Sequence, residues 1–216
     1  MKLNTNNNAY IIAYSCVMVI IVAFLLAFVS SVLKDRQDVN VALDKKKQVL
    51  AALNIRDLSD SESDAKYSEV VVDDAAFQLN SADYKAGNYK IYTCKVNGET
   101  KYVVPVYGMG LWGPIWGYIA VNADGNTIYG AYFNHESETA GLGAEIKDSK
   151  AWQDKFIGKK IYAPDGTPAL KVVKSSELKN PESEVDGITG ATLTSVGVSD
   201  MLQDGFKKYK TLLSHE

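Results

Sequence analysis

The chain has 216 residues, with 23 basic and 26 acidic side chains and a formal net charge of −3. A composition of 46% hydrophobic and 23% charged residues excludes a disordered, a collagen-like and a disulfide-framework protein. These averages are typical of one ordinary soluble domain, yet the apolar residues are concentrated near the N-terminus.

The first predicted element is an apolar run from Ala9 to Leu33 that contains no charged residue. As a helix it would be about 37 Å long, which exceeds the roughly 30 Å hydrocarbon core of a bilayer. A cleaved signal peptide would have a shorter apolar region and a small-residue cleavage site, which residues 28–33 do not offer. We therefore expect residues 1–33 to be an N-terminal tail and an uncleaved, single-pass anchor.

The charges beside this run give an orientation. Lys2 precedes it, whereas Lys34, Arg36 and the lysines at 45–47 follow it. By the positive-inside rule this distribution places the main domain in the cytoplasm, although acidic residues lie among the lysines and long domains translocate regardless of flanking charge.

Residues 34–74 are expected to be an amphipathic helix followed by an acidic linker. Residues at spacings of four and three mark one helical face: Val39, Leu43, Lys46, Leu50 and Leu53. This face packs on a partner subunit or on the protein's own domain, or else the segment is a solvated connecting helix. Residues 57–74 are acidic and rich in serine without a sustained period, which is typical of a linker.

The domain itself is expected at residues 75–216. Segments 89–96, 102–107, 115–121 and 127–133 are rich in aromatic and β-branched residues and are predicted to be strands. Asp124-Gly125 predicts a hairpin between the last two. A short helix at 150–157, a strand at 169–173 and a C-terminal helix that begins before Val198 complete an α+β fold, with a mainly antiparallel sheet flanked by helices.

Several kinds of chemistry lack the residues that they need. Cys16 lies in the anchor and Cys94 in the domain, so no disulfide between them is expected. The only histidines are His135 and His215, so we expect no metal site and a scaffold role for His135. The chain after the anchor has 22 basic and 26 acidic residues, so nucleic acid is not an expected partner. We predict no catalytic residue, because no nucleophile elbow or dinucleotide fingerprint occurs.

Two clusters could approach a ligand closely. The loop from His135 to Glu145 combines Glu138 and Thr139 with two glycines, but its spacing alone favours a plain turn. Residues 107–118 alternate aromatic residues with glycine, so they could wall a flat aromatic ligand or pack in the core.

A third cluster leads into the predicted C-terminal helix. Its hydroxyl groups belong to Thr189, Thr192, Thr194 and Ser195. Free backbone N–H groups and the positive end of the helix would favour a phosphate there, or else Thr194 or Ser195 caps the helix. The only arginines, Arg36 and Arg56, precede the domain. A phosphate would therefore be held by backbone amides, by lysine or by a covalent bond.

The order and spacing of these motifs resemble those of one family. The motifs are Gly110-Leu111-Trp112, Gly117-Tyr118-Ile119-Ala120, Asp124-Gly125-Asn126-Thr127-Ile128, the segment from Glu138 to Ile146, and the segment from Asp186 to Ser195. The chain resembles the C subunit of the Na+-translocating NADH:quinone reductase, within a wider group of FMN-binding domains that includes the G subunit of the Rnf electron-transport complex. The similarity covers the anchor and nearly all of the domain.

The resemblance implies that FMN is bound through a phosphoester to the hydroxyl of Thr192, and that a dedicated flavin transferase makes this bond from FAD. Such a bond would account for the missing arginines. The residues expected around the cofactor are Asp186, Gly187, Thr189, Gly190 and Ala191 near the phosphate, Glu138, Thr139, Gly141, Leu142 and Gly143 against the isoalloxazine, and Trp112.

The resemblance also implies a role in a larger assembly. The subunit would relay single electrons between other subunits of a membrane complex that reduces quinone with NADH and moves Na+. Its domain would lie on the periplasmic side of the bacterial inner membrane, and we follow this implication over the charge count. The alternatives are the Rnf G subunit and a membrane-anchored binding domain without a cofactor.

Overall fold

The computed structural model describes residues 7–214, so the predicted N-terminal tail, Lys2 and His215 lie outside the described residues. The chain divides into two compact units between Asp44 and Lys45. The first unit holds most of helix α1 (Asn8–Ala52), and the second holds the last turns of α1 and all later elements.

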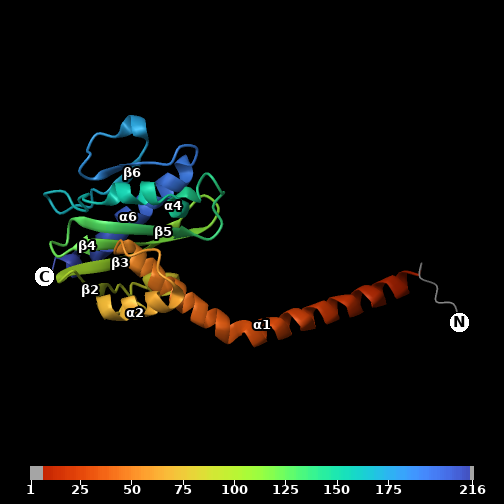
Figure 1. Ribbon diagram of the computed structural model, residues 1–216. Helices are drawn as coiled ribbons and strands as arrows, with labels where there is room; N and C mark the ends of the chain where they lie inside the picture. The colour runs from red at the N-terminus through yellow and green to blue at the C-terminus, as the bar shows by residue number, and fades with distance from the viewer. Residues whose placement is uncertain (1–6, 215–216) are drawn as a thin grey trace. The chain divides into compact units, whose positions relative to one another are not determined.

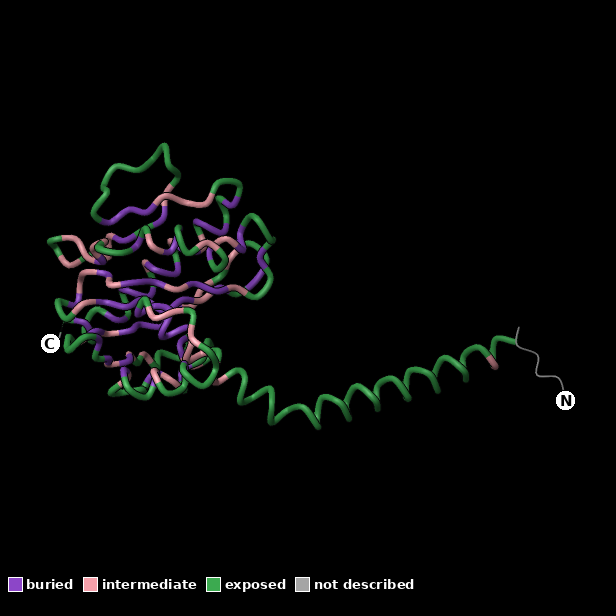
Figure 2. The backbone as a smooth tube through the Cα atoms, viewed as in Figure 1, coloured by how far each residue is buried: buried purple, intermediate pink, exposed green. Residues whose placement is uncertain are grey.

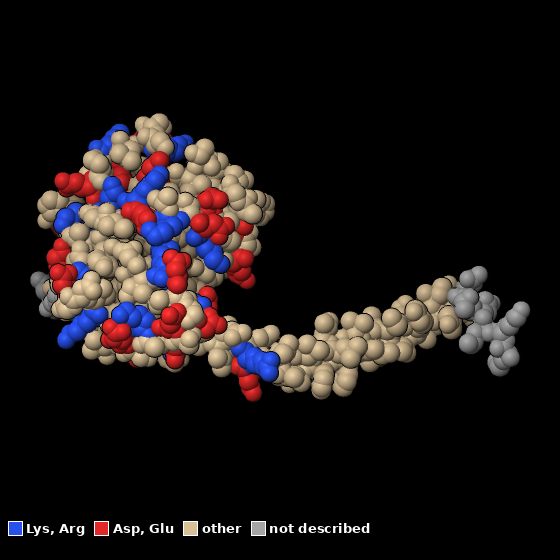
Figure 3. All heavy atoms as spheres, viewed as in Figure 1, with Lys and Arg blue, Asp and Glu red and all other residues tan. Residues whose placement is uncertain are grey.

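Helix α1 contains the predicted anchor. Its most apolar 18-residue window has a mean hydropathy of 3.0, and none of that window is buried in the structure. Figure 2 shows this part of α1 exposed along its length, and Figure 3 shows it without acidic or basic side chains. A long helix whose apolar side chains have no protein to pack against is stable in a bilayer, and α1 is long and apolar enough to cross one.

The second unit is built on an antiparallel sheet with the strand order β1-β2-β3-β4-β5 (Figure 1). The strands are β1 (Val71–Asp73), β2 (Tyr92–Val96), β3 (Glu99–Met109), β4 (Pro114–Asn122) and β5 (Ile128–His135). The four predicted strands are thereby confirmed. The predicted hairpin joins β4 to β5, and Gly125 adopts the left-handed φ of +67° that its turn requires.

Residues that alternate along the strands of the sheet belong to two different hydrophobic cores. On β4, Ile119 and Val121 belong to the first core, whereas Tyr118 and Ala120 belong to the second. Helix α6 (Thr192–Leu213) covers the first core, and the end of α1 with α2 (Asp60–Val70) covers the second. This is the α+β arrangement expected from the sequence.

Short elements complete the domain. They are α3 (Ser81–Lys85), α4 (Glu145–Asp148), α5 (Lys150–Gln153), η1 (Asp154–Phe156), β6 (Lys171–Val173), η2 (Ser175–Glu177) and β7 (Glu184–Asp186). The predicted helix at 150–157 corresponds to α5 and η1, and the predicted strand at 169–173 corresponds to β6. Strands β6 and β7 pair in parallel. Strand β7 is not predicted from the sequence, because three residues are too few to show a period of two.

The compact unit begins at Lys45 rather than at residue 75. Leu50 and Leu53, on the predicted amphipathic face, are fully buried in the second core. Of the alternatives left open by the sequence, packing on the protein's own domain is therefore the one observed for this end of α1.

Residues 57–74, expected to be a linker, instead form α2 and β1. Ser59 caps α2, and Glu62 returns a bond to the Ser59 backbone in a reciprocal capping box. Tyr67 and Val70 are the large apolar residues that α2 buries. Two such residues in three turns leave no visible helical period, which explains the difference.

Buried tyrosines give the domain a pH limit. Burial raises the pKa of Tyr107 to about 12 and those of Tyr84, Tyr92 and Tyr209 further above their ordinary value. The contribution of these neutral, buried tyrosines to the free energy of unfolding is fully present below the pKa of tyrosine in the unfolded chain, about 10. It is lost as the pH rises from there towards the pKa values in the folded domain. In an alkaline titration, we expect the tyrosinate absorbance of these four residues to appear only as the circular dichroism of the fold is lost. Ionisation of these residues in a folded domain would contradict the prediction.

Candidate functional site

Three loops from distant parts of the sequence meet at the start of α6. They are the turn after β3 at residues 110–113, the loop after β5 at residues 136–144 and the loop after β7 at residues 187–191. The sequence singled out each loop as a separate cluster. The structure brings all three together around the first turn of one helix.

Glu138 holds the three loops together. Its carboxylate is buried, and Oε1 accepts a hydrogen bond from the backbone N–H of Trp112 at 2.8 Å. The other oxygen, Oε2, accepts from the hydroxyl of Thr194 on α6 at 2.6 Å. The backbone N–H of Glu138 donates to Nδ1 of His135 at 3.1 Å, so His135 has the scaffold role expected of it. The Glu138 carboxylate is thus engaged by protein groups on both sides.

Glycines make room for this carboxylate. A Cβ atom added at Gly110 would lie 2.4 Å from Oε1 of Glu138, and one added at Gly143 would lie 2.4 Å from Oε2. Both distances are far below van der Waals contact. Glycine is therefore required at these two positions by close packing and not by backbone conformation.

The two glycines of the 138–143 loop should respond differently to substitution. Gly143→Ala forces its methyl group against Glu138 and Thr194, and we expect it to lower the free energy of unfolding by about 2 to 3 kcal/mol. Gly141 faces open space at φ +71°, so Gly141→Ala should cost only the backbone strain of about 1 kcal/mol. Urea unfolding of both variants measures the difference. An equal or larger loss for Gly141→Ala would contradict the packing argument.

Thr192 is the first residue of α6, and its side chain is exposed. The residue before it, Ala191, occupies the N-cap position and offers no side-chain acceptor. Neither Thr194 nor Ser195 caps the helix, since Thr194 bonds to Glu138 and Ser195 begins the next turn. The N–H groups of the first turn and the positive end of the helix dipole thus remain beside the Thr192 hydroxyl.

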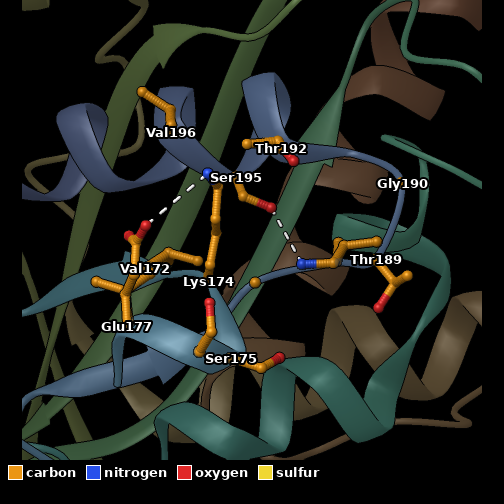
Figure 4. A pocket seen from close by; sticks show the side chains of 13 residues that line it. Val172, Lys174, Ser175, Glu177, Thr189, Gly190, Thr192, Ser195 and Val196 are labelled. Carbon is orange, nitrogen blue, oxygen red and sulfur yellow. Dashed lines mark hydrogen bonds and ion pairs between the residues drawn. The ribbon is translucent and has the colours of Figure 1, made fainter. Parts of the chain in front are cut away.

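This hydroxyl lies on a groove of about 600 Å³ (Figure 4). One wall is residues 172–177, from β6 and η2, and the other is residues 187–190 with the first turn of α6. Ser195 Oγ accepts a hydrogen bond from the backbone N–H of Ile188 at 3.1 Å, which ties the second wall to the helix. Of the predicted residues, Gly187, Thr189, Gly190 and Thr192 line the groove. Its volume lies within the range of small-molecule sites.

Asp186 is not among the residues that line the groove. Its carboxylate accepts a hydrogen bond from the Ser175 hydroxyl and pairs with Lys155 at 3.2 Å, and these contacts hold the pKa of Asp186 below its ordinary value. Its carbonyl accepts from the indole N–H of Trp152 at 2.8 Å. Asp186 thus positions the loop that follows it. The sequence showed no signal for Trp152 or Ser175, because their partners are remote in the chain.

Exposed apolar side chains lie on the other two loops and on the first turn of α6. Trp112 and Leu142 were expected there, and both are exposed. Leu142 packs against the 187–191 loop, since a Cβ added at Gly190 would lie 2.9 Å from its Cδ2. Thr139 and Gly141 are exposed on the same loop as Leu142. Leu193 on α6 is a further exposed apolar residue, which lies within the motif from Asp186 to Ser195 but was not predicted as a site residue. Such a surface is suited to a planar aromatic group.

The region that holds the three loops is shared with known proteins. A family model described as an FMN-binding domain matches residues 110–207, which contain all three loops. The C subunit of the Na(+)-translocating NADH-quinone reductase of Vibrio anguillarum is 34% identical over 198 residues, which cover 77% of each chain. The corresponding protein of Vibrio alginolyticus is 43% identical over 115 residues, covering 53% of this chain and 44% of that protein, so this match spans less than half of the relative's length.

A solved structure shows the same fold. The crystal structure of the C subunit of the Na(+)-translocating NADH-quinone reductase from Parabacteroides distasonis superimposes with a TM-score of 0.78 at 36% sequence identity. The match covers 85% of this chain and 98% of that one. The similarity therefore extends well beyond the segment matched by the family model.

Proposed function

The chain belongs to the family of the C subunits of Na(+)-translocating NADH-quinone reductases, and we propose that it is a membrane-anchored flavoprotein subunit that carries FMN as a phosphoester on Thr192. The observation that carries this proposal is the position of the Thr192 hydroxyl. It is exposed at the uncapped start of a 22-residue helix, on the wall of a groove, within the region that matches the FMN-binding domain.

The surroundings of Thr192 fit a phosphoester. The first turn of α6 offers backbone N–H groups and a positive dipole end to an anion. Arg56, the one arginine of the second unit, donates to the carbonyl of Ala131 and to Gln153 Oε1 at 2.7 Å, so its guanidinium is committed elsewhere. A covalent bond to Thr192 would hold the phosphate without the bidentate arginine that tightly bound phosphates commonly use.

We propose that a separate flavin transferase makes this bond from FAD. The Thr192 oxygen would bond to the phosphorus of the FMN half, the bond from that phosphorus to the AMP half would break, and the hydroxyl proton would pass to a base or to water. A threonine hydroxyl that is exposed and free of an internal acceptor suits this role, whereas Thr194 is buried and donates to Glu138.

When bound, FMN supplies electron transfer through its isoalloxazine ring. The chain's own residues would hold that ring: Glu138 ties together the loops that would contact it, and Trp112 and Leu142 would offer it apolar contact at the surface. A ring at the surface can be approached by a redox partner. We propose that the domain relays single electrons from a metal centre to the next flavin of an NADH:quinone reductase complex that moves Na+.

The test of the proposed function is the mass of the expressed chain. We expect the full chain, produced together with a flavin transferase, to gain the mass of one FMN residue and to show flavin fluorescence on a denaturing gel. The same chain produced without the transferase is the control. An unmodified wild-type chain under both conditions would leave a cofactor-free binding domain as the better description.

Both Vibrio relatives favour the C subunit of the reductase over the G subunit of an Rnf complex.

We propose that the domain lies on the periplasmic side of the inner membrane, although the flanking charges indicate the opposite. Ser61 is exposed on α2, whereas Cys94 is buried and Cys16 lies in the apolar part of α1. Ser61→Cys in a Cys16→Ser background should therefore react with an impermeant thiol reagent in intact cells. Labelling only after cell lysis would place the domain in the cytoplasm.

A further inference from the structure

The wall of the groove that faces Thr192 was not singled out by the sequence. It consists of the end of β6, Lys174 and the η2 turn, Ser175–Glu177. Two hydrogen bonds fix it to the end of β7 and the loop that follows: the backbone N–H of Gly187 donates to the carbonyl of Val173 at 2.8 Å, and the Ser175 hydroxyl donates to Asp186. Lys174 therefore begins from a backbone position that is fixed relative to the start of α6.

Lys174 is the one basic residue among the described residues that line this groove, and Glu177 is the one acidic residue. Figure 4 shows the Lys174 side chain extended along the groove towards the first turn of α6. Its Nζ atom lies 3.8 Å from Oε1 of Glu177, and both side chains are 60% exposed. An ion pair of that length and exposure contributes little to the stability of the fold, so the Lys174 ammonium group is available to another anion.

We propose that Lys174 is the phosphate-binding cation of the Thr192 site and that Glu177 competes with the phosphate for it. The inference rests on the proposed attachment of FMN to Thr192. A phosphodiester brings one negative charge into a groove whose formal charges, one lysine and one glutamate, sum to zero. Lys174 neutralises that charge when it leaves Glu177, while the Glu177 carboxylate repels it.

Opposite effects of substitutions at positions 174 and 177 on the rate of flavin attachment distinguish this proposal from a structural role. With limiting transferase and FAD, Lys174→Gln should slow the initial rate of flavin attachment to the full chain about three- to fivefold, the range expected for one partly exposed charge. Lys174→Arg should retain the rate, and Glu177→Gln should increase it. The differences should shrink as salt is added.

The matched control is the pair Lys207 and Asp204, which lies on α6 with the same spacing, at 3.3 Å and with side chains 61% and 64% exposed. Neither residue lines the groove. Lys207→Gln and Asp204→Asn should leave the rate of attachment unchanged. Equal slowing by Lys207→Gln and Lys174→Gln, or slowing by Glu177→Gln, would overturn the proposal.

A second measurement reads the phosphate itself. The ³¹P resonance of the loaded chain, in a detergent without phosphorus, should shift in Lys174→Gln and stay in place in Lys207→Gln. If Lys174→Gln loads too poorly to be measured, Glu177→Gln and Lys174→Arg provide the comparison. An unmoved resonance in all variants at position 174 or 177 overturns the inference but leaves the proposed function intact. Absence of flavin from the wild-type chain contradicts the proposed function itself.

Discussion

Thr192→Val should abolish covalent flavin attachment, because valine keeps the branched shape of threonine and removes the hydroxyl oxygen that would form the proposed phosphoester. The side chain is exposed, so no buried hydrogen bond is lost and the fold should be unaffected. We expect the variant, produced with the transferase, to show no flavin fluorescence on a denaturing gel and the unmodified mass. Thermal unfolding close to that of the unloaded wild type would confirm that the loss is chemical.

The neighbouring threonines serve as controls for this variant. Thr189 lines the same groove and is exposed, so Thr189→Val should still carry flavin at least in part. Thr194→Val should also carry it, but with a lower free energy of unfolding, since its hydroxyl bonds to Glu138 in the interior. Covalent flavin that persists in Thr192→Val and disappears in one of the other two would identify a different hydroxyl as the attachment site.

The sheet was predictable because its strands carry local signals. Aromatic and β-branched residues mark β2 to β5, and Asp124-Gly125 marks a turn whose conformation glycine favours. Helix α2 was missed because its stabilisation comes from the Ser59 cap and from two apolar contacts with a sheet formed later in the sequence. Such an element depends on tertiary packing and leaves little trace in a local window.

The sequence marks the candidate site by its residue types and not by its geometry. The hydroxyl cluster and the glycine-rich loop were visible as motifs, and the family resemblance pointed to Thr192. Nothing local shows that Glu138 binds Trp112 and Thr194, or that Lys174 lies across a groove from the start of α6, because these partners are far apart in the chain. Gly110 and Gly143 become explicable only once the buried carboxylate between them is seen.

Glu138→Ala should be among the most destabilising substitutions near the site. It leaves the Trp112 N–H and the Thr194 hydroxyl without their acceptor in a buried position, and the expected loss in free energy of unfolding is about 3 kcal/mol. Glu138→Gln should lose less, because the amide oxygen can still accept from Trp112 while its NH₂ group donates to the Thr194 hydroxyl. Urea unfolding of the unloaded chain gives both values.

Glu136→Ala is the matched control, since Glu136 is an exposed glutamate on the same loop and should cost less than about 0.5 kcal/mol. The role of Glu138 as a tie can be separated from simple loss of volume by the double variant Glu138→Ala with Thr194→Val. If the two residues act through their mutual hydrogen bond, the double variant loses less stability than the sum of the single losses. Strict additivity, or a loss in Glu138→Ala no larger than in Glu136→Ala, would contradict the buried tie.

Because this tie fixes the first turn of α6, Glu138→Ala should also slow flavin attachment at Thr192, two residues from Thr194, while Glu136→Ala does not.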